Sequence, residues 1–209
     1  MMNNPSDIPQ PGHAGSSGAM ASAFGSAMPA VILTVFGFIW LGWGFSANAA
    51  FTDFSSNRAL PATRWISFYV AFLVLLGLAI GELRREKARM STHAAHPSEF
   101  WAHTGRKLKI VSMLEGLGCG LVVLLVVLFH HMDLLAVGIS LVVGLHFFPL
   151  ASLLRVPAYY AGGVAIILCD LLSVAWLRSE DFTFSTGVAT GSILWLMAIY
   201  KLFRSRQVF

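Results

Sequence analysis

The sequence predicts an all-α integral membrane protein in which six transmembrane helices form one bundle and both termini lie in the cytoplasm. The first observation behind this prediction is composition, because 56% of the 209 residues are hydrophobic and only 11% are charged. The second is the length of the apolar blocks, and the third is the placement of lysine and arginine. A soluble domain of this length does not have such a composition.

The apolar residues occur in blocks of the length that a membrane-spanning helix requires. A helix rises about 1.5 Å per residue, so roughly 20 residues cross a hydrocarbon core of ~30 Å. None of the blocks shows the alternation of apolar and polar residues that is typical of a membrane β-strand. The six expected helices cover residues 29–47, 64–82, 109–129, 133–154, 158–178 and 183–203.

The connections between these blocks predict how neighbouring helices are arranged. The last three connections are only a few residues long, so the helices that they join must form antiparallel hairpins. Residues 83–108 form a longer, basic segment that we expect to be a cytoplasmic loop. Residues 1–27 are rich in proline, glycine, serine and alanine, a composition that predicts a disordered tail.

Lysine and arginine residues are distributed unevenly between the two expected sides of the membrane. Short loops that carry these residues are retained in the cytoplasm. Eleven of the 14 fall on the side of the termini, which predicts an inner (plasma) membrane protein with cytoplasmic N- and C-termini. Because this asymmetry accounts for most of the net charge of +4, we exclude nucleic acid as a partner. The three on the other side are Arg58, Arg64 and Arg178.

Three pairs of glycines are spaced four residues apart within the expected helices. Apolar helices in lipid associate through small residues that let their backbones approach. The pairs are compatible with packing inside one chain and with contacts in a homo-oligomer, and the small size of the chain favours a dimer or larger assembly for a transporter. The pairs are Gly77 and Gly81, Gly116 and Gly120, and Gly187 and Gly191.

Three ionisable residues lie deep within consecutive helices: Glu115, His146 and Asp170. A charged residue at the centre of a bilayer is costly and usually marks a polar network or a path for an ion. Counted from the cytoplasmic ends of their helices, the three lie at depths of roughly 9, 12 and 18 Å. The hairpin that joins the third and fourth helices makes contact between Glu115 and His146 geometrically plausible. Such groups can load and release protons, or they can form a hydrogen-bonded knot that holds helices together.

Two further residues are candidates for lining a ligand site. Pro149 removes the helical donor for the carbonyl of Leu145, which leaves a backbone acceptor one residue before His146. Trp40 lies deeper than the usual interfacial belt of aromatic residues and has glycines nearby. Ordinary packing is the favoured interpretation of Trp40, and prolines such as Pro149 are also common in ordinary transmembrane helices.

Two groups of histidines raise the question of a metal site. His130, His131 and Asp133 occupy the outer turn between the third and fourth helices, and all three are acceptable ligands for a first-row metal. The basic loop carries a second group, which consists of His93, His96, Glu99 and His103. Adjacent histidines rarely bind one ion together, and a polar loop accumulates histidine without function. No sequence motif requires a metal or another cofactor.

Three classes of function fit this pattern. The first is a channel or transporter for a small solute or ion, with Glu115, His146 and Asp170 in the path. The second is an accessory or scaffold subunit, in which the same residues form a buried network. The third is a membrane-embedded enzyme that uses Glu115 and His146 as acid and base, although the motifs of common hydrolases and nucleotide-binding sites were not found.

Overall fold

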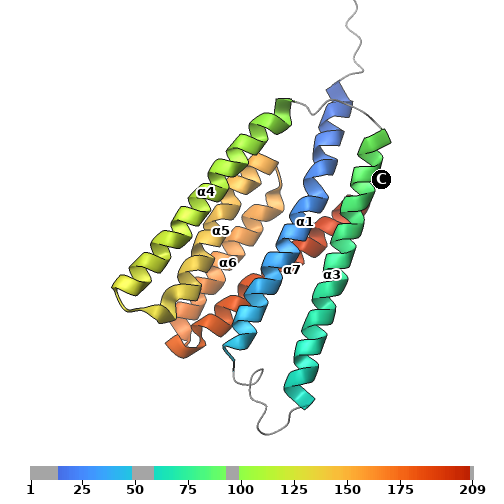
Figure 1. Ribbon diagram of the computed structural model, residues 1–209. Helices are drawn as coiled ribbons and strands as arrows, with labels where there is room; N and C mark the ends of the chain where they lie inside the picture. Colours follow the sequence, from blue (N-terminus) through green and yellow to red (C-terminus); the bar gives the residue numbers. More distant parts are fainter. Residues whose placement is uncertain (1–13, 49–58, 93–98, 208–209) are drawn as a thin grey trace, which may run out of the picture.

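The computed structural model describes the backbone of residues 14–48, 59–92 and 99–207. Throughout these residues the regular structure is helical (Figure 1). Two short 3-10 helices, η1 (Met132–Leu134) and η2 (Ser179–Asp181), lie in the turns before α5 and α7. The α-helices are α1 (Ala14–Ser46), α3 (Ala59–Thr92), α4 (Glu99–Leu128), α5 (Leu135–Leu154), α6 (Pro157–Trp176) and α7 (Phe182–Gln207).

Each of these six α-helices carries a segment that is long and apolar enough to cross a membrane. The predicted all-α, six-span architecture is therefore confirmed in the part of the chain that the structure describes. The segments match the expected helices to within a few residues. They are Ala27–Ser46, Thr63–Arg85, Gly105–Leu128, Met132–Leu154, Pro157–Trp176 and Ser179–Arg204, the fourth and sixth of which include η1 and η2.

Several helices extend beyond the segments that lipid would cover. The α1 helix begins at Ala14, inside the stretch 1–27 that was expected to be a disordered tail. The α3 helix continues to Thr92 and α4 begins at Glu99, so helix occupies most of the expected loop 83–108. For α3 and α4 the physical reason is helix propensity, because alanine, glutamate, lysine and arginine favour helix beyond the apolar run. Residues 1–13 and 93–98 lie outside the described part of the chain.

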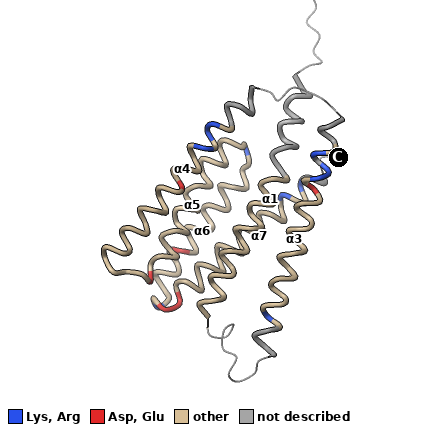
Figure 2. The backbone as a smooth tube through the Cα atoms, in the orientation of Figure 1, with Lys and Arg blue, Asp and Glu red and all other residues tan. Residues whose placement is uncertain are grey.

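The start of α1 and the end of α7 lie at the same end of the bundle. The α1 helix begins, and α7 ends, at the upper end in Figure 1. Most of the lysines and arginines drawn in colour lie toward that end, whereas the acidic residues of the turns before α5 and α7 lie at the other (Figure 2). This distribution agrees with the sequence-based expectation that most lysines and arginines lie on the side of the termini. That the basic end faces the cytoplasm stays a prediction.

The closest helix contact joins α1 and α7 through glycines. A Cβ atom added to Gly187 would lie 2.6 Å from the Cα atom of Gly44, and one added to Gly191 would lie 2.8 Å from the carbonyl oxygen of Gly37. No real side chain fits at these distances, so the two backbones touch. The pair Gly187 and Gly191 therefore packs inside one chain.

The other two glycine pairs face open space. A Cβ atom added to any of these four glycines would meet nothing within 4 Å. Contact with lipid or with another copy of the chain is compatible with this openness, so the homo-oligomer interpretation stays a prediction for these two pairs. They are Gly77 and Gly81 in α3, and Gly116 and Gly120 in α4.

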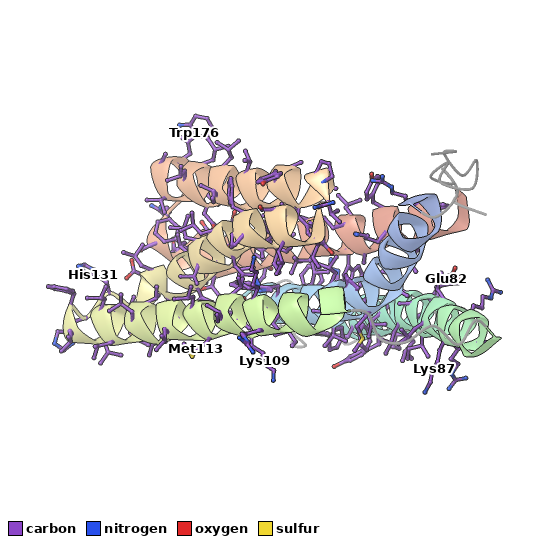
Figure 3. The ribbon with its side chains drawn as sticks, turned by 90° about the horizontal axis from the view of Figure 1, so that it is seen from above. Glu82, Lys87, Lys109, Met113, His131 and Trp176 are labelled. Atoms are coloured by element: carbon purple, nitrogen blue, oxygen red, sulfur yellow. The ribbon has the colours of Figure 1, made fainter. Side chains whose placement is uncertain are left out.

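Four helices share the main core, and two helices lie at its edges. The core is formed by α1, α5, α6 and α7, which contribute the buried residues Trp40, Phe147, Ile166 and Leu194, respectively. The α4 helix packs mainly on α5, and α3 packs mainly on α1. Only 6% of the apolar segment of α4 is buried, and the side chain of Met113 points away from the bundle (Figure 3). These outward apolar faces are suited to contact with lipid.

Tight turns produce the predicted hairpins. Arg155 adopts a left-handed conformation with φ 54°, and the next amide, of Val156, donates to the carbonyl of Ala151 at 3.0 Å. Pro157 then occupies the first turn of α6, where its missing N–H costs nothing. His130 closes the turn after α4 in the same way, with φ 58°. The antiparallel pairing of α4 with α5, and of α5 with α6, follows from these turns.

The glycine contact gives a prediction for stability. Gly187→Ala should destabilise the fold by about 1–3 kcal/mol, because the new methyl group would force two backbones apart. Gly77→Ala is the matched control, and it should be neutral or stabilising, since alanine is about 1 kcal/mol better than glycine in a helix. Unfolding of both variants in mixed detergent micelles measures the difference. Equal stability of the two variants would contradict the close contact of α1 and α7.

Candidate functional site

Glu115 and His146 meet across the hairpin of α4 and α5. Glu115 Oε2 lies 3.4 Å from His146 Nε2. The short turn between the helices fixes their relative position along the hairpin, so residues at similar depth come to face each other. The structure thus brings together two of the three ionisable residues that the sequence places deep in the membrane.

This pair is partly open at the edge of the bundle. The side chain of His146 is 12% exposed and that of Glu115 is 25% exposed. The backbone carbonyl of Val111, one turn before Glu115, also lies beside the imidazole. Two acceptors therefore face one imidazole, an arrangement that can take up and release a proton.

Asp170 occupies a different environment, at the junction of α5, α6 and α7. The residue is 0% exposed. The hydroxyl groups of Ser140 in α5 and Thr186 in α7 lie beside its carboxyl group, but neither meets the geometry of a hydrogen bond. Both carboxyl oxygens are left without a partner among the described residues, and so is Thr186 Oγ1. Leaving a buried polar group unpaired costs ~1–3 kcal/mol, and more if the group is charged.

Hydroxyl residues surround this junction and form their own hydrogen bonds. Ser140 Oγ lies 2.6 Å from Thr190 Oγ1, which joins α5 to α7. Ser173 Oγ lies 2.8 Å from Ser185 Oγ, which joins α6 to α7, and Ser173 also donates to the carbonyl of Cys169. These bonds link hydroxyl groups of α5, α6 and α7 to one another.

Sequence reasoning missed these serines and threonines. Hydroxyl residues are common in transmembrane helices, and the sequence does not say which of them face a given neighbour. One signal was available, because Thr186 and Thr190 are four residues apart and so share a face of α7. Ser173 likewise follows Asp170 by three residues on α6.

The expected depths of Glu115, His146 and Asp170 on consecutive helices predict one ladder from one leaflet to the centre of the membrane. The structure places the three residues in two groups instead. Ser140 and His146 are six positions apart on α5, which directs their side chains about 120° apart around the helix. Ser140 faces the junction that contains Asp170, whereas His146 faces Glu115 on α4. The α5 helix therefore separates the two groups.

The candidate metal ligands in the outer turn form one weak contact. His131 Nδ1 lies 3.9 Å from Asp133 Oδ1, and His131 is well exposed. No three histidine, cysteine, aspartate or glutamate side chains gather at one point within the described residues, so His130 does not complete a set with this pair. The side chains of the loop group, His93, His96, Glu99 and His103, lie outside the described residues.

Trp40 and Pro149 occupy positions that packing explains. Trp40 is 4% exposed within the main core, and its ring centroid lies 5.4 Å from that of Trp43. Pro149 is exposed on the outer surface of α5. Leu145, whose carbonyl the proline leaves without a helical donor, is 59% exposed. The interrupted backbone therefore faces away from the junction that contains Asp170.

A second buried polar region lies near the basic end of the bundle. Lys201 is 6% exposed, and its Nζ atom lies 5.0 Å from the ring centroid of Tyr159, itself a buried residue. Glu82 is also buried, and its Oε2 atom lies 3.4 Å from a guanidinium nitrogen of Arg85. The sequence reading treated both Lys201 and Glu82 only as markers of helix ends. Their burial shows that ionisable side chains near this end of the bundle also pack inside the fold.

A pocket lies between α1, α3 and α7, toward the end of the bundle opposite the basic one. Its volume is about 500 Å³. None of the residues predicted as a site lines it. Its lining combines aromatic residues with a few polar ones, namely Leu41, Phe45, Thr63, Arg64, Ser67, Phe68, Ser192 and Trp195.

The contact of Glu115 with His146 predicts an energetic coupling. In a double-mutant cycle of Glu115→Gln and His146→Gln, we expect a coupling energy of roughly 0.5–3 kcal/mol, because the two side chains touch inside a medium of low dielectric constant. The cycle of Glu115→Gln with His131→Gln is the control, and its effects should add within about 0.5 kcal/mol. Reversible unfolding in mixed micelles measures both cycles. Additive effects in the first cycle would contradict the contact.

Comparison with models of protein families, with curated proteins and with solved structures finds no match to this chain.

Proposed function

We propose that this protein is a carrier that moves a small ion or solute across a membrane, with Asp170 at its central binding position. One observation supports the proposal above the others. Asp170 is completely buried between three helices, yet both of its carboxyl oxygens lack a partner among the described residues. An acid that served only to hold helices together would gain stability from satisfied hydrogen bonds, and Asp170 has none of these with the described residues.

The enclosure of Asp170 favours a carrier over an open channel. A channel exposes its polar residues to a continuous column of water. Asp170, Ser140, Thr186 and Thr190 are instead all 0% exposed. This enclosure is what an occluded state would require, in which the bound species has access to neither side and helix movement then opens one side.

Glu115 and His146 are proposed to supply the proton-linked step. Their contact lies on the α4 side of α5, whereas Asp170 lies on the α6 and α7 side. A change in the protonation of this pair would alter the attraction between α4 and α5. Because α4 packs mainly on α5, α4 is the helix most readily moved by such a change.

An accessory subunit is the second candidate, and the exposed face of α4 favours it. Glu115 is partly exposed there, and the neighbouring Gly116 and Gly120 have open space beside them. A partner helix that covered this face would shield the carboxylate from lipid. An enzyme that uses the partly open pair Glu115 and His146 is the third candidate.

The proposed setting is the inner (plasma) membrane, with the basic end of the bundle in the cytoplasm. The excess of lysine and arginine at the end where α1 begins and α7 ends supports this orientation. A dimer or larger assembly is proposed for a chain of 209 residues, with the open glycine pairs of α3 and α4 as candidate contacts.

Transport assays with purified protein in liposomes test the proposal. Vesicles that contain a trapped pH-sensitive dye receive an imposed gradient of sodium, potassium, ammonium or a small organic acid. The intact protein should couple at least one of these gradients to proton movement, and Asp170→Asn should slow this movement about ten-fold or more, because it removes the intramembrane acid. Thr34→Val is the control, since the Thr34 hydroxyl bonds only within its own helix among the described residues, to the carbonyl of Ala30.

Two outcomes would overturn the carrier proposal. The first is that vesicles with intact protein behave like empty vesicles under every gradient. The second is that Asp170→Asn transports as fast as the intact protein.

A further inference from the structure

The unpaired polar atoms of the described core all occur in one place. Among the described side chains, three buried oxygen or nitrogen atoms lack a hydrogen-bond partner, namely Asp170 Oδ1, Asp170 Oδ2 and Thr186 Oγ1. Asp170 and Thr186 belong to neighbouring helices, and the threonine hydroxyl lies beside the carboxyl group. Buried atoms of this kind usually bind a water molecule or an ion. Three such atoms at one junction indicate a single binding position.

The charge of the junction indicates what this position would hold. A carboxylate buried in a bilayer is costly unless it is protonated or a cation lies beside it. No lysine or arginine contacts Asp170 among the described residues. One monovalent cation would bring the net charge to zero, whereas a divalent cation would leave a surplus positive charge in the membrane.

The chemistry of the donors narrows the choice further. The atoms around the position are carboxylate and hydroxyl oxygens, which bind hard cations. Ser140 of α5 contributes a second hydroxyl group, and Thr190 holds the Ser140 side chain in place through the 2.6 Å contact of their hydroxyl oxygens. Because all of these residues are completely buried, the position suits a small ion that has lost most of its water.

We propose that Asp170, Ser140 and Thr186 form a site for one sodium ion, with Thr190 as a positioning residue. The carboxylate supplies the compensating charge, and the hydroxyl groups of two other helices supply neutral oxygen ligands. A bound ion would thus add a link between α5, α6 and α7 to the hydroxyl contacts already there. The role of sodium as the transported or coupling ion rests on the proposed carrier function. Sodium binding itself is measured without transport.

Thermal unfolding of the intact protein in detergent tests sodium binding. At a fixed pH and ionic strength, replacing choline with sodium at about ten times its Kd should raise Tm by roughly 3–6 °C, because an ion that binds only the folded state stabilises it. Potassium at the same concentration should give a clearly smaller shift. Titration of the shift against sodium concentration gives the Kd.

Variants assign the shift to this junction. Asp170→Asn should abolish the sodium-dependent shift, and Thr186→Val should raise the Kd at least several-fold while leaving the fold intact. Thr34→Val is the matched control, because Thr34 is an equally buried threonine in α1 whose hydroxyl bonds to the carbonyl of Ala30. This control should keep the full shift.

The proposal is overturned if sodium and choline give the same Tm for the intact protein, or if Asp170→Asn keeps the full sodium shift. A carrier that moves protons in vesicles but shows no sodium shift would overturn the sodium site and leave the carrier function standing. A sodium-dependent rise in Tm without transport under any gradient would overturn the carrier function and leave the sodium site standing.

Discussion

The arrangement of the core depends on the contact between the backbones of α1 and α7. Gly187 and Gly191 allow this contact, with Gly44 and Gly37 on the opposite helix. Thr186 and Thr190 directly precede these glycines in the sequence, so their side chains point about 100° away around the same helix. The glycines therefore fix α7 against α1 on one face, and this position sets where the threonine hydroxyls meet α5 and α6 on another. A shift of α7 away from α1 would move the hydroxyl groups relative to Asp170.

The bundle consists of a buried centre and two less-buried edges. The helices α1, α5, α6 and α7 share the main core, while α3 and α4 each rest mainly on one neighbour. The two polar groups reflect this division. Asp170 lies inside the centre, where all its neighbours are fixed, whereas the contact of Glu115 with His146 joins the centre to the more exposed α4. If the protein is a carrier, the centre would hold the ion and α4 would respond to protonation.

Much of the fold follows from the sequence, because the bilayer imposes simple rules on it. Helix length, short connections and the placement of lysine and arginine predict the six spans and the hairpins. The contact of Glu115 with His146 was plausible from the same rules, since a hairpin relates depth on one helix to depth on the next. Rotation of each helix about its axis is not determined in this way. For this reason the sequence placed Asp170 in one ladder with His146, whereas α5 directs Ser140 and His146 to different neighbours.

Other differences have equally simple causes. The helices extend beyond the expected membrane spans, and in α3 and α4 helix propensity continues the helix past the apolar residues. Trp40 packs in the core and Pro149 faces outward, two outcomes that depend on the face that each residue occupies. The hydroxyl residues around Asp170 were missed because their importance comes from three helices that meet, and no single segment of sequence shows this meeting.

Asp170 is proposed to bind an ion rather than to hold the helices together. The most direct measurement is the unfolding midpoint of Asp170→Asn and of the intact protein, compared in sodium-free buffer. If the acid is an unpaired group that costs stability when no ion is bound, the variant should unfold at the same temperature or a higher one. A midpoint lower by several degrees would contradict the account, because it would show that the carboxyl group itself stabilises the junction of α5, α6 and α7.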